Sequence, residues 1–195
     1  MLGLLHPTDP AWVDAVEGDL STMLQDHAQC ELKAAHSALS LVGRYAAELP
    51  SMAAPLLALA REESEHVGMV HERLQQRDLP LGHPQSDRYV TMLTAATKRN
   101  RHDGFPPLLD RLLMAALIEG RSCERFRLLA ASLKDASLRA FYKELMASEA
   151  RHFTLFNQLA TEAFGQQAAK SRFATLATRE GEICRSLPLG PQVHG

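Results

Sequence analysis

The sequence predicts an all-α protein built on a four-helix bundle, and three observations carry that prediction. Only 6% of its 195 residues are aromatic, and Ala and Leu dominate the apolar set, a composition that favours packed helices over sheets. Four long segments repeat apolar residues at helical spacing. Two of those segments carry the same short motif, Glu-x-x-His, at Glu63–His66 and at Glu149–His152.

The first half of the chain predicts a short helix followed by a helical hairpin. A capping side chain and a proline predict a short helix over residues 11–17. A long helix is expected over 19–48, and Pro50 ends it. A second long helix, with another proline in its first turn, runs to about Arg77, and the Pro- and Gly-containing stretch 78–84 predicts a loop.

The second half predicts another hairpin, reached through a crossover connection. A shorter helix over 86–98 leads into a basic loop, and the third and fourth long helices are expected over 107–131 and 135–163. A further helix over 166–185 precedes a Pro/Gly-containing tail, 187–195, which we expect to be loosely held. The two hairpins form an approximate internal repeat.

Four glutamates lie on the apolar stripes of the four long helices. Glu63 and Glu149 each precede a histidine by three residues, so each pair lies about 60° apart around a helix and projects from one face. Glu31 and Glu119 occupy similar stripes on the preceding helices. An ionised carboxylate is rarely buried without a cation or a hydrogen-bonding partner, so the four glutamates require an explanation.

The position of each glutamate pair along its hairpin supports a shared site. In an antiparallel helix pair, two residues lie at one height when the turn falls halfway between them. Ala47, beside the first helix break, is the sequence midpoint of Glu31 and Glu63, and Lys134 is the midpoint in the second hairpin. One Glu from each of two helices, with Glu-x-x-His from each of the others, is the ligand pattern of ferritin-like di-iron or di-manganese proteins. The sequence therefore predicts a ferritin-like bundle whose metal ligands are Glu31, Glu63, His66, Glu119, Glu149 and His152.

Simpler interpretations compete with the metal site at several positions. A single Glu-x-x-His would more often be a pair of satisfied polar residues. Glu62 lies four residues before His66, but the second motif has a serine in the equivalent place, which favours Glu63 as the ligand. His27 and His36, near the first stripe, are by default ordinary core or surface residues, with a role beside a ligand as the alternative.

Composition limits the class of protein. The formal net charge of −2 excludes a global basic field, so any nucleic-acid contact must come from a local patch. Three cysteines without C-x-x-C spacing favour reduced thiols in a cytoplasmic protein. Neither a secretion signal nor an apolar run of membrane-spanning length is present, and 195 residues with 46% hydrophobic content suit a single domain over 1–195.

The predicted ligands limit which metal ions the site can bind and which reactions it can support. Four carboxylates and two imidazoles form a hard site without thiolate, which suits iron or manganese. The inserted crossover favours a substrate pocket over simple iron storage. A ferritin-like iron oxidase or store, a peroxide-scavenging di-metal protein, a di-manganese catalase and a non-catalytic helical module remain as alternatives.

Five stretches of the sequence resemble the bacterial tRNA 2-methylthio-N6-isopentenyladenosine hydroxylase family: Leu5–Trp12, Cys30–Ala35, Arg61–His66, Ala116–Phe126 and Ser148–Phe153. The resemblance extends over nearly the whole chain. It implies a non-haem di-iron monooxygenase that hydroxylates the isopentenyl chain of the adenosine beside the anticodon. It also implies two iron ions as cofactor, O2 and an external reductant as co-substrates, and tRNA and an electron-donating reductase as partners.

The same resemblance gives the basic residues a possible role. By default they form solvated faces. If the substrate is tRNA, candidate contacts to its phosphate backbone are Lys98, Arg99, Arg101, Arg121 and Arg125.

Overall fold

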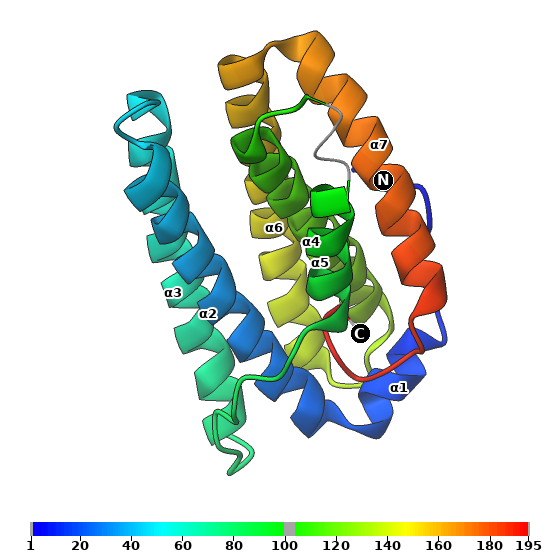
Figure 1. Ribbon diagram of the computed structural model, residues 1–195. Helices are drawn as coiled ribbons and strands as arrows, with labels where there is room; N and C mark the ends of the chain where they lie inside the picture. Colours follow the sequence, from blue (N-terminus) through cyan, green and yellow to red (C-terminus); the bar gives the residue numbers. More distant parts are fainter. Residues whose placement is uncertain (1, 100–103, 195) are drawn as a thin grey trace. The chain divides into compact units, whose positions relative to one another are not determined.

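The structure is a computed structural model that describes residues 2–99 and 104–194, and over these residues it contains helices and no strand (Figure 1). The all-helical prediction is thus confirmed for the described chain. The elements are α1 (Trp12–Gly18), α2 (Leu20–Tyr45), the 3-10 helix η1 (Pro50–Met52), α3 (Ala53–Gln75), α4 (Arg88–Arg99), α5 (Pro107–Ser132), α6 (Ala136–Phe164) and α7 (Gln166–Ser186).

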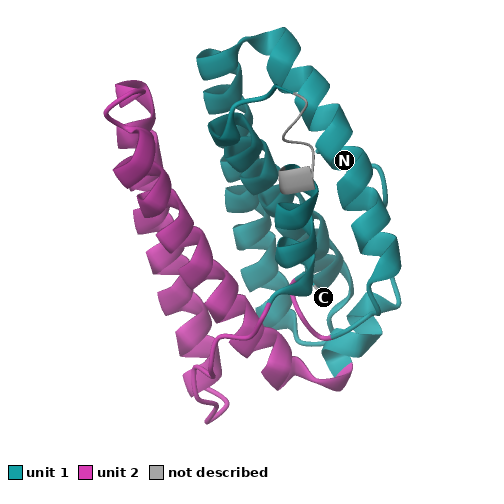
Figure 2. Ribbon diagram, viewed as in Figure 1, with its two compact units in different colours: residues 1–17, 87–190, 194–195 teal, residues 18–86, 191–193 magenta. Residues whose placement is uncertain are grey.

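Two compact units make up the chain (Figure 2). Unit 1 comprises residues 1–17, 87–190 and 194–195, and unit 2 comprises residues 18–86 and 191–193. Each unit contains one of the predicted long hairpins, and the prediction of a single domain over 1–195 stays a prediction. Within the part of the chain that the structure describes, no helix combines the length and apolar character needed to cross a membrane.

Unit 2 is the hairpin of α2 and α3, which pack side by side (Figure 1). Asp19 begins α2 by accepting hydrogen bonds from the backbone N–H and the hydroxyl of Thr22, at 3.0 and 2.7 Å. The helix ends at Tyr45, three residues earlier than predicted, because the chain turns before Pro50 opens η1. The predicted hairpin with its break near Pro50 is confirmed.

The loop after α3 is fastened to α2 by side chains spaced four residues apart. Gln25 Nε2 donates to the Pro80 carbonyl at 3.0 Å, and Gln29 Nε2 donates to the Gly82 carbonyl at 3.3 Å. Lys33 Nζ completes the series with a 3.0 Å hydrogen bond to the Gln85 carbonyl. One face of α2 therefore orders a loop that lacks helical hydrogen bonds of its own.

Unit 1 contains the second hairpin, α5 and α6, with α4 and α7 packed against it. Asp135 caps α6 by accepting from the N–H groups of Ser137 and Leu138 at 2.8 and 3.2 Å. Gly165 separates α6 from α7 with a φ of 84°, a conformation that costs glycine little. These boundaries agree with the predicted ones to within two residues at each end.

Val193 and His194, near the end of the tail, are held by specific contacts, contrary to the expectation of a loosely held tail over 187–195. Val193 is buried, and its N–H donates to Asp26 Oδ2 at 2.8 Å. His194 is also buried, with Nε2 3.0 Å from Ser122 Oγ and Nδ1 3.1 Å from Asp87 Oδ2. Specific polar partners, found far away in sequence, order these residues.

Candidate metal centre

Unit 2 brings together three of the predicted ligands. Glu31 projects from α2, while Glu63 and His66 project from one face of α3, and all three side chains are buried. His66 Nδ1 lies 3.0 Å from Glu63 Oε2 and 3.8 Å from Glu31 Oε2. The carboxylates thus meet across the hairpin at one height, as the midpoint argument predicts.

A second histidine supports Glu31 from its own helix. The Nε2–H of His27 donates to Glu31 Oε1 at 2.7 Å, and the imidazole is fully buried. The default interpretation of His27 as an ordinary residue misses this interaction, although the four-residue spacing on one apolar stripe is its signal in the sequence. His36 lies on the exposed side of α2, in agreement with its default interpretation as a surface residue.

The electrostatics of unit 2 keep the Glu31 carboxylate ionised. Burial by itself raises the pKa of Glu31, but the hydrogen bond from His27 and the nearby imidazole of His66 outweigh burial and hold the pKa below its usual range. Burial lowers the pKa of His66, whereas the nearby carboxylates of Glu31 and Glu63 raise it, to about 9 overall. Without metal, the His66 proton therefore balances part of the negative charge.

Unit 1 repeats the arrangement with the other three predicted ligands. Glu119 projects from α5, while Glu149 and His152 project from α6, and all three are buried. His152 Nδ1 lies 3.8 Å from Glu119 Oε2, the same separation that His66 keeps from Glu31. The internal repeat seen in the sequence is therefore also a repeat of side-chain geometry.

The residues of each unit suit a hard metal ion. Among the predicted ligands, each unit buries two carboxylates and one imidazole, a donor set that favours iron or manganese over metals that prefer thiolate. Burying two carboxylates is costly unless a cation or hydrogen-bond donors compensate them. The chemistry of the donors thus fits the metal that the ligand pattern predicts.

The cysteines do not add thiolate to this donor set. No disulfide joins Cys30, Cys123 and Cys184, all of which lie in the described residues. The thiol of Cys123 donates to the Met146 carbonyl at 3.4 Å, and burial raises its pKa. All three thiols are partly buried, and their reduced state stays a prediction from the sequence.

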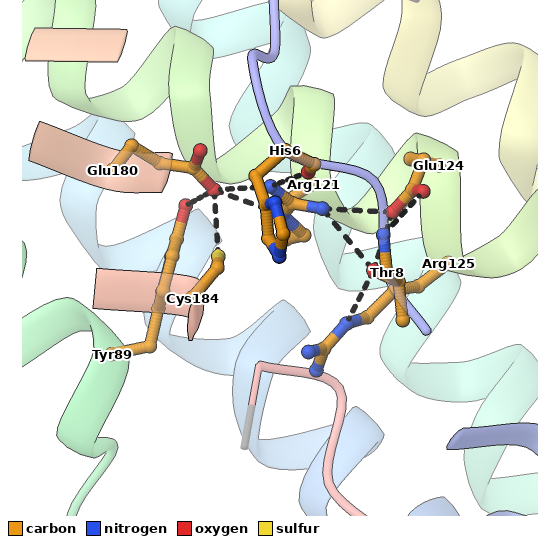
Figure 3. A network of polar contacts seen from close by, with 8 residues as sticks. All are labelled: His6, Thr8, Tyr89, Arg121, Glu124, Arg125, Glu180 and Cys184. Atoms are coloured by element: carbon orange, nitrogen blue, oxygen red, sulfur yellow. Dashed lines mark hydrogen bonds and ion pairs between the residues drawn. The ribbon is translucent and has the colours of Figure 1, made fainter. Parts of the chain in front are cut away.

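Two of the predicted tRNA contacts lie in the interior of unit 1. Arg121 is only 1% exposed and forms ion pairs with Glu124 and Glu180, at 2.9 and 2.7 Å (Figure 3). Arg125 is buried with its guanidinium 4.9 Å from the centre of the Trp12 ring. The prediction that these two side chains contact RNA is wrong, because both are buried: Glu180 of α7 and Glu124 of α5 pair with Arg121, and Trp12 of α1 lies against Arg125.

The other three basic residues remain as predicted candidates. Lys98 and Arg99 belong to the last turn of α4, but their side chains lie outside what the structure describes. Arg101 lies outside the described residues altogether. Their role as phosphate contacts stays a prediction from the sequence.

Comparisons with known proteins agree on one family. A family model described as tRNA-(MS[2]IO[6]A)-hydroxylase (MiaE) matches residues 2–195. The chain is similar to the tRNA 2-(methylsulfanyl)-N(6)-isopentenyladenosine(37) hydroxylase of Pseudomonas putida, at 38% identity over 92% of this chain and 85% of that protein. It is similar to the Salmonella typhimurium protein of the same name, at 30% identity over 98% of this chain and 86% of that protein.

A solved structure shows a closely similar fold. It is described as Protein 43 with aldehyde deformylating oxygenase activity from Synechococcus, and it has a TM-score of 0.89 and 34% sequence identity to this chain. The likeness covers 98% of this chain and 95% of that one. The prediction of a ferritin-like helical fold is confirmed by this neighbour.

Proposed function

The chain belongs to the tRNA-(MS[2]IO[6]A)-hydroxylase family, and from that premise we propose that it hydroxylates 2-methylthio-N6-isopentenyladenosine in tRNA. The reaction would add one hydroxyl group to the isopentenyl chain of the adenosine beside the anticodon. The observation that carries the proposal is the family match over residues 2–195. Two relatives named as hydroxylases of this nucleoside at position 37 support it.

Glu31, Glu63, His66, Glu119, Glu149 and His152 are proposed to hold two iron ions. Support comes from the two units, each of which buries one Glu facing a Glu-x-x-His motif, the pattern of di-iron carboxylate proteins. Bound iron would supply the O2 chemistry needed to hydroxylate a C–H bond, with electrons from an external reductant such as a reductase.

Neighbouring residues affect the orientation, protonation and solvent access of these ligands. His27 holds the Glu31 carboxylate in one orientation through its 2.7 Å hydrogen bond. His66 carries a proton in the metal-free protein, and this proton must leave before the imidazole can bind metal. Burial of all six side chains limits the access of water, which protects an oxidising centre from side reactions.

The tRNA would be recognised outside this buried set. Its target base lies in a single-stranded loop, where it can be splayed out with little loss of pairing. Lys98, Arg99 and Arg101 are proposed to contact the phosphate backbone, because they form the basic run of the crossover. A tRNA substrate and three cysteines without a disulfide support a cytoplasmic location.

Mass spectrometry of nucleosides tests the proposed reaction. Iron-loaded protein, reductant and 18O2 would be incubated with tRNA that bears the isopentenyl modification. We expect one 18O atom on the isopentenyl nucleoside, and none with Glu119→Ala. An unlabelled nucleoside from protein that holds two reducible iron ions would contradict the proposed substrate.

One observation favours a second candidate activity. The solved structure with aldehyde deformylating oxygenase activity is 34% identical over nearly the whole chain, so an aldehyde is the alternative substrate. Deformylation would release a one-carbon product from an aldehyde and leave tRNA unchanged. Iron storage, the alternative from the ligand pattern, would accumulate iron mineral without any organic product.

A further inference from the structure

The face of α5 opposite Glu119 is polar, although it is buried in unit 1. Arg121, Glu124 and Arg125 follow Glu119 at positions about 200°, 140° and 240° around the helix axis. All three are buried. A buried helix face is usually apolar, so this set of charged side chains calls for an explanation beyond packing.

Arg121 is the centre of a hydrogen-bonded network on that face (Figure 3). Its Nε and Nη2 lie 2.9 and 2.7 Å from Glu180 Oε1 of α7. Nη1 donates to Glu124 Oε2 at 2.9 Å and to Thr8 Oγ1 at 3.1 Å, while Nη2 donates to the His6 carbonyl at 2.8 Å. One guanidinium thus joins α5 to α7 and to the N-terminal segment.

Glu180 extends the network to α4. The hydroxyl of Tyr89 donates to Glu180 Oε1 at 3.1 Å, and both side chains are fully buried. The Tyr89 ring also stacks on the imidazole of His194, with centroids 5.3 Å apart and planes 17° from parallel. Tyr89 therefore connects the start of α4 with the carboxylate that binds Arg121.

A second polar link joins α4 to α5 next to the first. Ser122 Oγ lies 3.0 Å from His194 Nε2, and His194 Nδ1 donates to Asp87 Oδ2 at 3.1 Å. The other oxygen of Asp87 caps α4 by accepting from the Val90 N–H at 2.9 Å. The residues that follow Glu119 in sequence are thus connected to α4 twice.

The order Ser122–His194–Asp87 matches the connectivity of a nucleophilic triad, but its setting does not suit catalysis. Ser122 lies inside α5 and is 6% exposed. Backbone N–H groups in a helix interior are engaged in helical hydrogen bonds, so they cannot stabilise an oxyanion beside the serine. The arrangement serves as a structural link.

Directional bonds restrict a helix in a way that apolar packing does not. A buried ion pair contributes little net stability compared with apolar residues of the same size, but it accepts only a narrow range of geometries. The bonds from Arg121 to Glu180, to Thr8 and to the His6 carbonyl oppose rotation of α5 about its axis and sliding along it, whereas Glu124 belongs to α5 itself. Any such movement would change the direction of Glu119, two residues away.

We propose that Arg121 and Glu180 are positioning residues, which fix the rotation of α5 and so aim Glu119 at the metal, with Tyr89 linking this position to α4. The inference rests on the proposed role of Glu119 as a metal ligand. Arg121, Glu180 and Tyr89 are not among the six proposed metal ligands. Their effect on metal binding passes through the backbone of α5.

A matched pair of substitutions tests the proposal. Arg172 also joins α7 to α5, through hydrogen bonds of 2.6 and 3.0 Å to Asp110, and it is as buried as Arg121. Asp110 lies nine residues before Glu119, so Arg172→Lys perturbs a similar ion pair away from the ligand. Arg121→Lys and Arg172→Lys would be compared in the full-length protein, with thermal unfolding measured for each.

The decisive readouts are iron affinity and the absorption spectrum of the iron-loaded protein without tRNA. For Arg121→Lys we expect roughly tenfold weaker iron binding and an altered spectrum, an effect of the size seen for residues that support metal ligands. Arg172→Lys should keep both properties, even if its unfolding temperature falls equally. Tyr89→Phe, which removes one hydroxyl, should change the iron affinity and the spectrum in the same direction as Arg121→Lys. It provides the test if Arg121→Lys does not fold.

Equal effects of Arg121→Lys and Arg172→Lys, or an unchanged spectrum and affinity in Arg121→Lys and Tyr89→Phe, would overturn the positioning role. Failure of the proposed function looks different. The proposed metal site would be contradicted if the wild-type protein bound no iron. It would also be contradicted if Glu119→Ala bound iron as tightly as the wild-type protein. If the protein binds two iron ions tightly but forms no hydroxylated nucleoside, the proposed substrate is wrong. The comparison of iron affinities still tests the positioning role in that case.

Discussion

At the scale of single residues, the clearest consequence of the buried network concerns the thiol of Cys184. Burial raises its pKa, and the negative charge of Glu180, 3.0 Å away, raises it further, to about 12. Only the thiolate reacts with alkylating reagents, so the folded protein should protect Cys184. Its labelling rate should keep rising about tenfold per pH unit beyond pH 9, where an ordinary thiol levels off.

Mass spectrometry of the peptide that contains Cys184, after timed alkylation, would measure this rate. Unfolded protein provides the control, because there the thiol should react as an ordinary one. Glu180→Gln should lower the Cys184 pKa and accelerate labelling at pH 8. A rate that levels off near pH 9 in the folded protein would show that Glu180 and burial do not act on the thiol as described.

Neighbouring positions on one helix provide a test at the scale of the element. Glu63 is buried and faces His66, whereas Glu65, two residues later, is exposed on α3. Glu63→Gln should lower iron affinity more than about 100-fold, since it removes a proposed ligand and not only a supporting residue. Glu65→Gln should change iron affinity less than about twofold. Isothermal titration of both variants with iron would measure the affinities, and equal losses would contradict the role of Glu63 as a ligand.

Two glycines of unit 2 should respond oppositely to alanine. Gly82, in the loop fastened to α2, has a φ of 78°, and an added Cβ would lie 3.2 Å from Gln25 Cβ. Gly82→Ala should therefore lower the free energy of unfolding by about 1–2 kcal/mol. Gly68 lies inside α3 with nothing within 4 Å of its added Cβ, so Gly68→Ala should raise stability by about 0.5–1 kcal/mol.

Urea denaturation of both glycine variants would measure these changes. The two substitutions add the same methyl group, so the sign of each effect reports the backbone conformation and the space around each glycine. Destabilisation by Gly68→Ala would mean that α3 is packed more tightly there than the structure describes. A neutral Gly82→Ala would mean that the loop can adopt another conformation at no cost in stability.

At the scale of the whole molecule, recognition of tRNA should depend on a local basic run, because the net charge is −2. Neutralising Lys98, Arg99 or Arg101 should weaken tRNA binding and reduce the slope of log affinity against log salt by about 0.7–1 for each phosphate interaction that is removed. Arg179, an exposed residue of α7 paired with Glu182, provides the control. Binding of tRNA would be measured over a series of salt concentrations. If the variants at Lys98, Arg99 and Arg101 had the same slope as Arg179→Gln, these three residues would not be phosphate contacts.

Several features of the site could be predicted because helical period and chain distance encode them. The spacing of Glu63 and His66 determines that they share a face, and the midpoint at Ala47 determines that Glu31 reaches their height. Family membership and the hydroxylase class also followed from sequence motifs. The helix ends followed from caps and breakers such as Asp135 and Gly165, whose effects act within a few residues.

The tertiary structure decided the partners of residues that lie far apart in the chain. Arg121 could be an exposed cation or a buried one by its local sequence, and only Glu180, 59 residues later, settles that it is buried. His194 similarly becomes ordered through Ser122 and Asp87. Period and capping are local properties of a helix, whereas burial of a charge depends on which distant side chain meets it, and one-dimensional spacing does not contain that information.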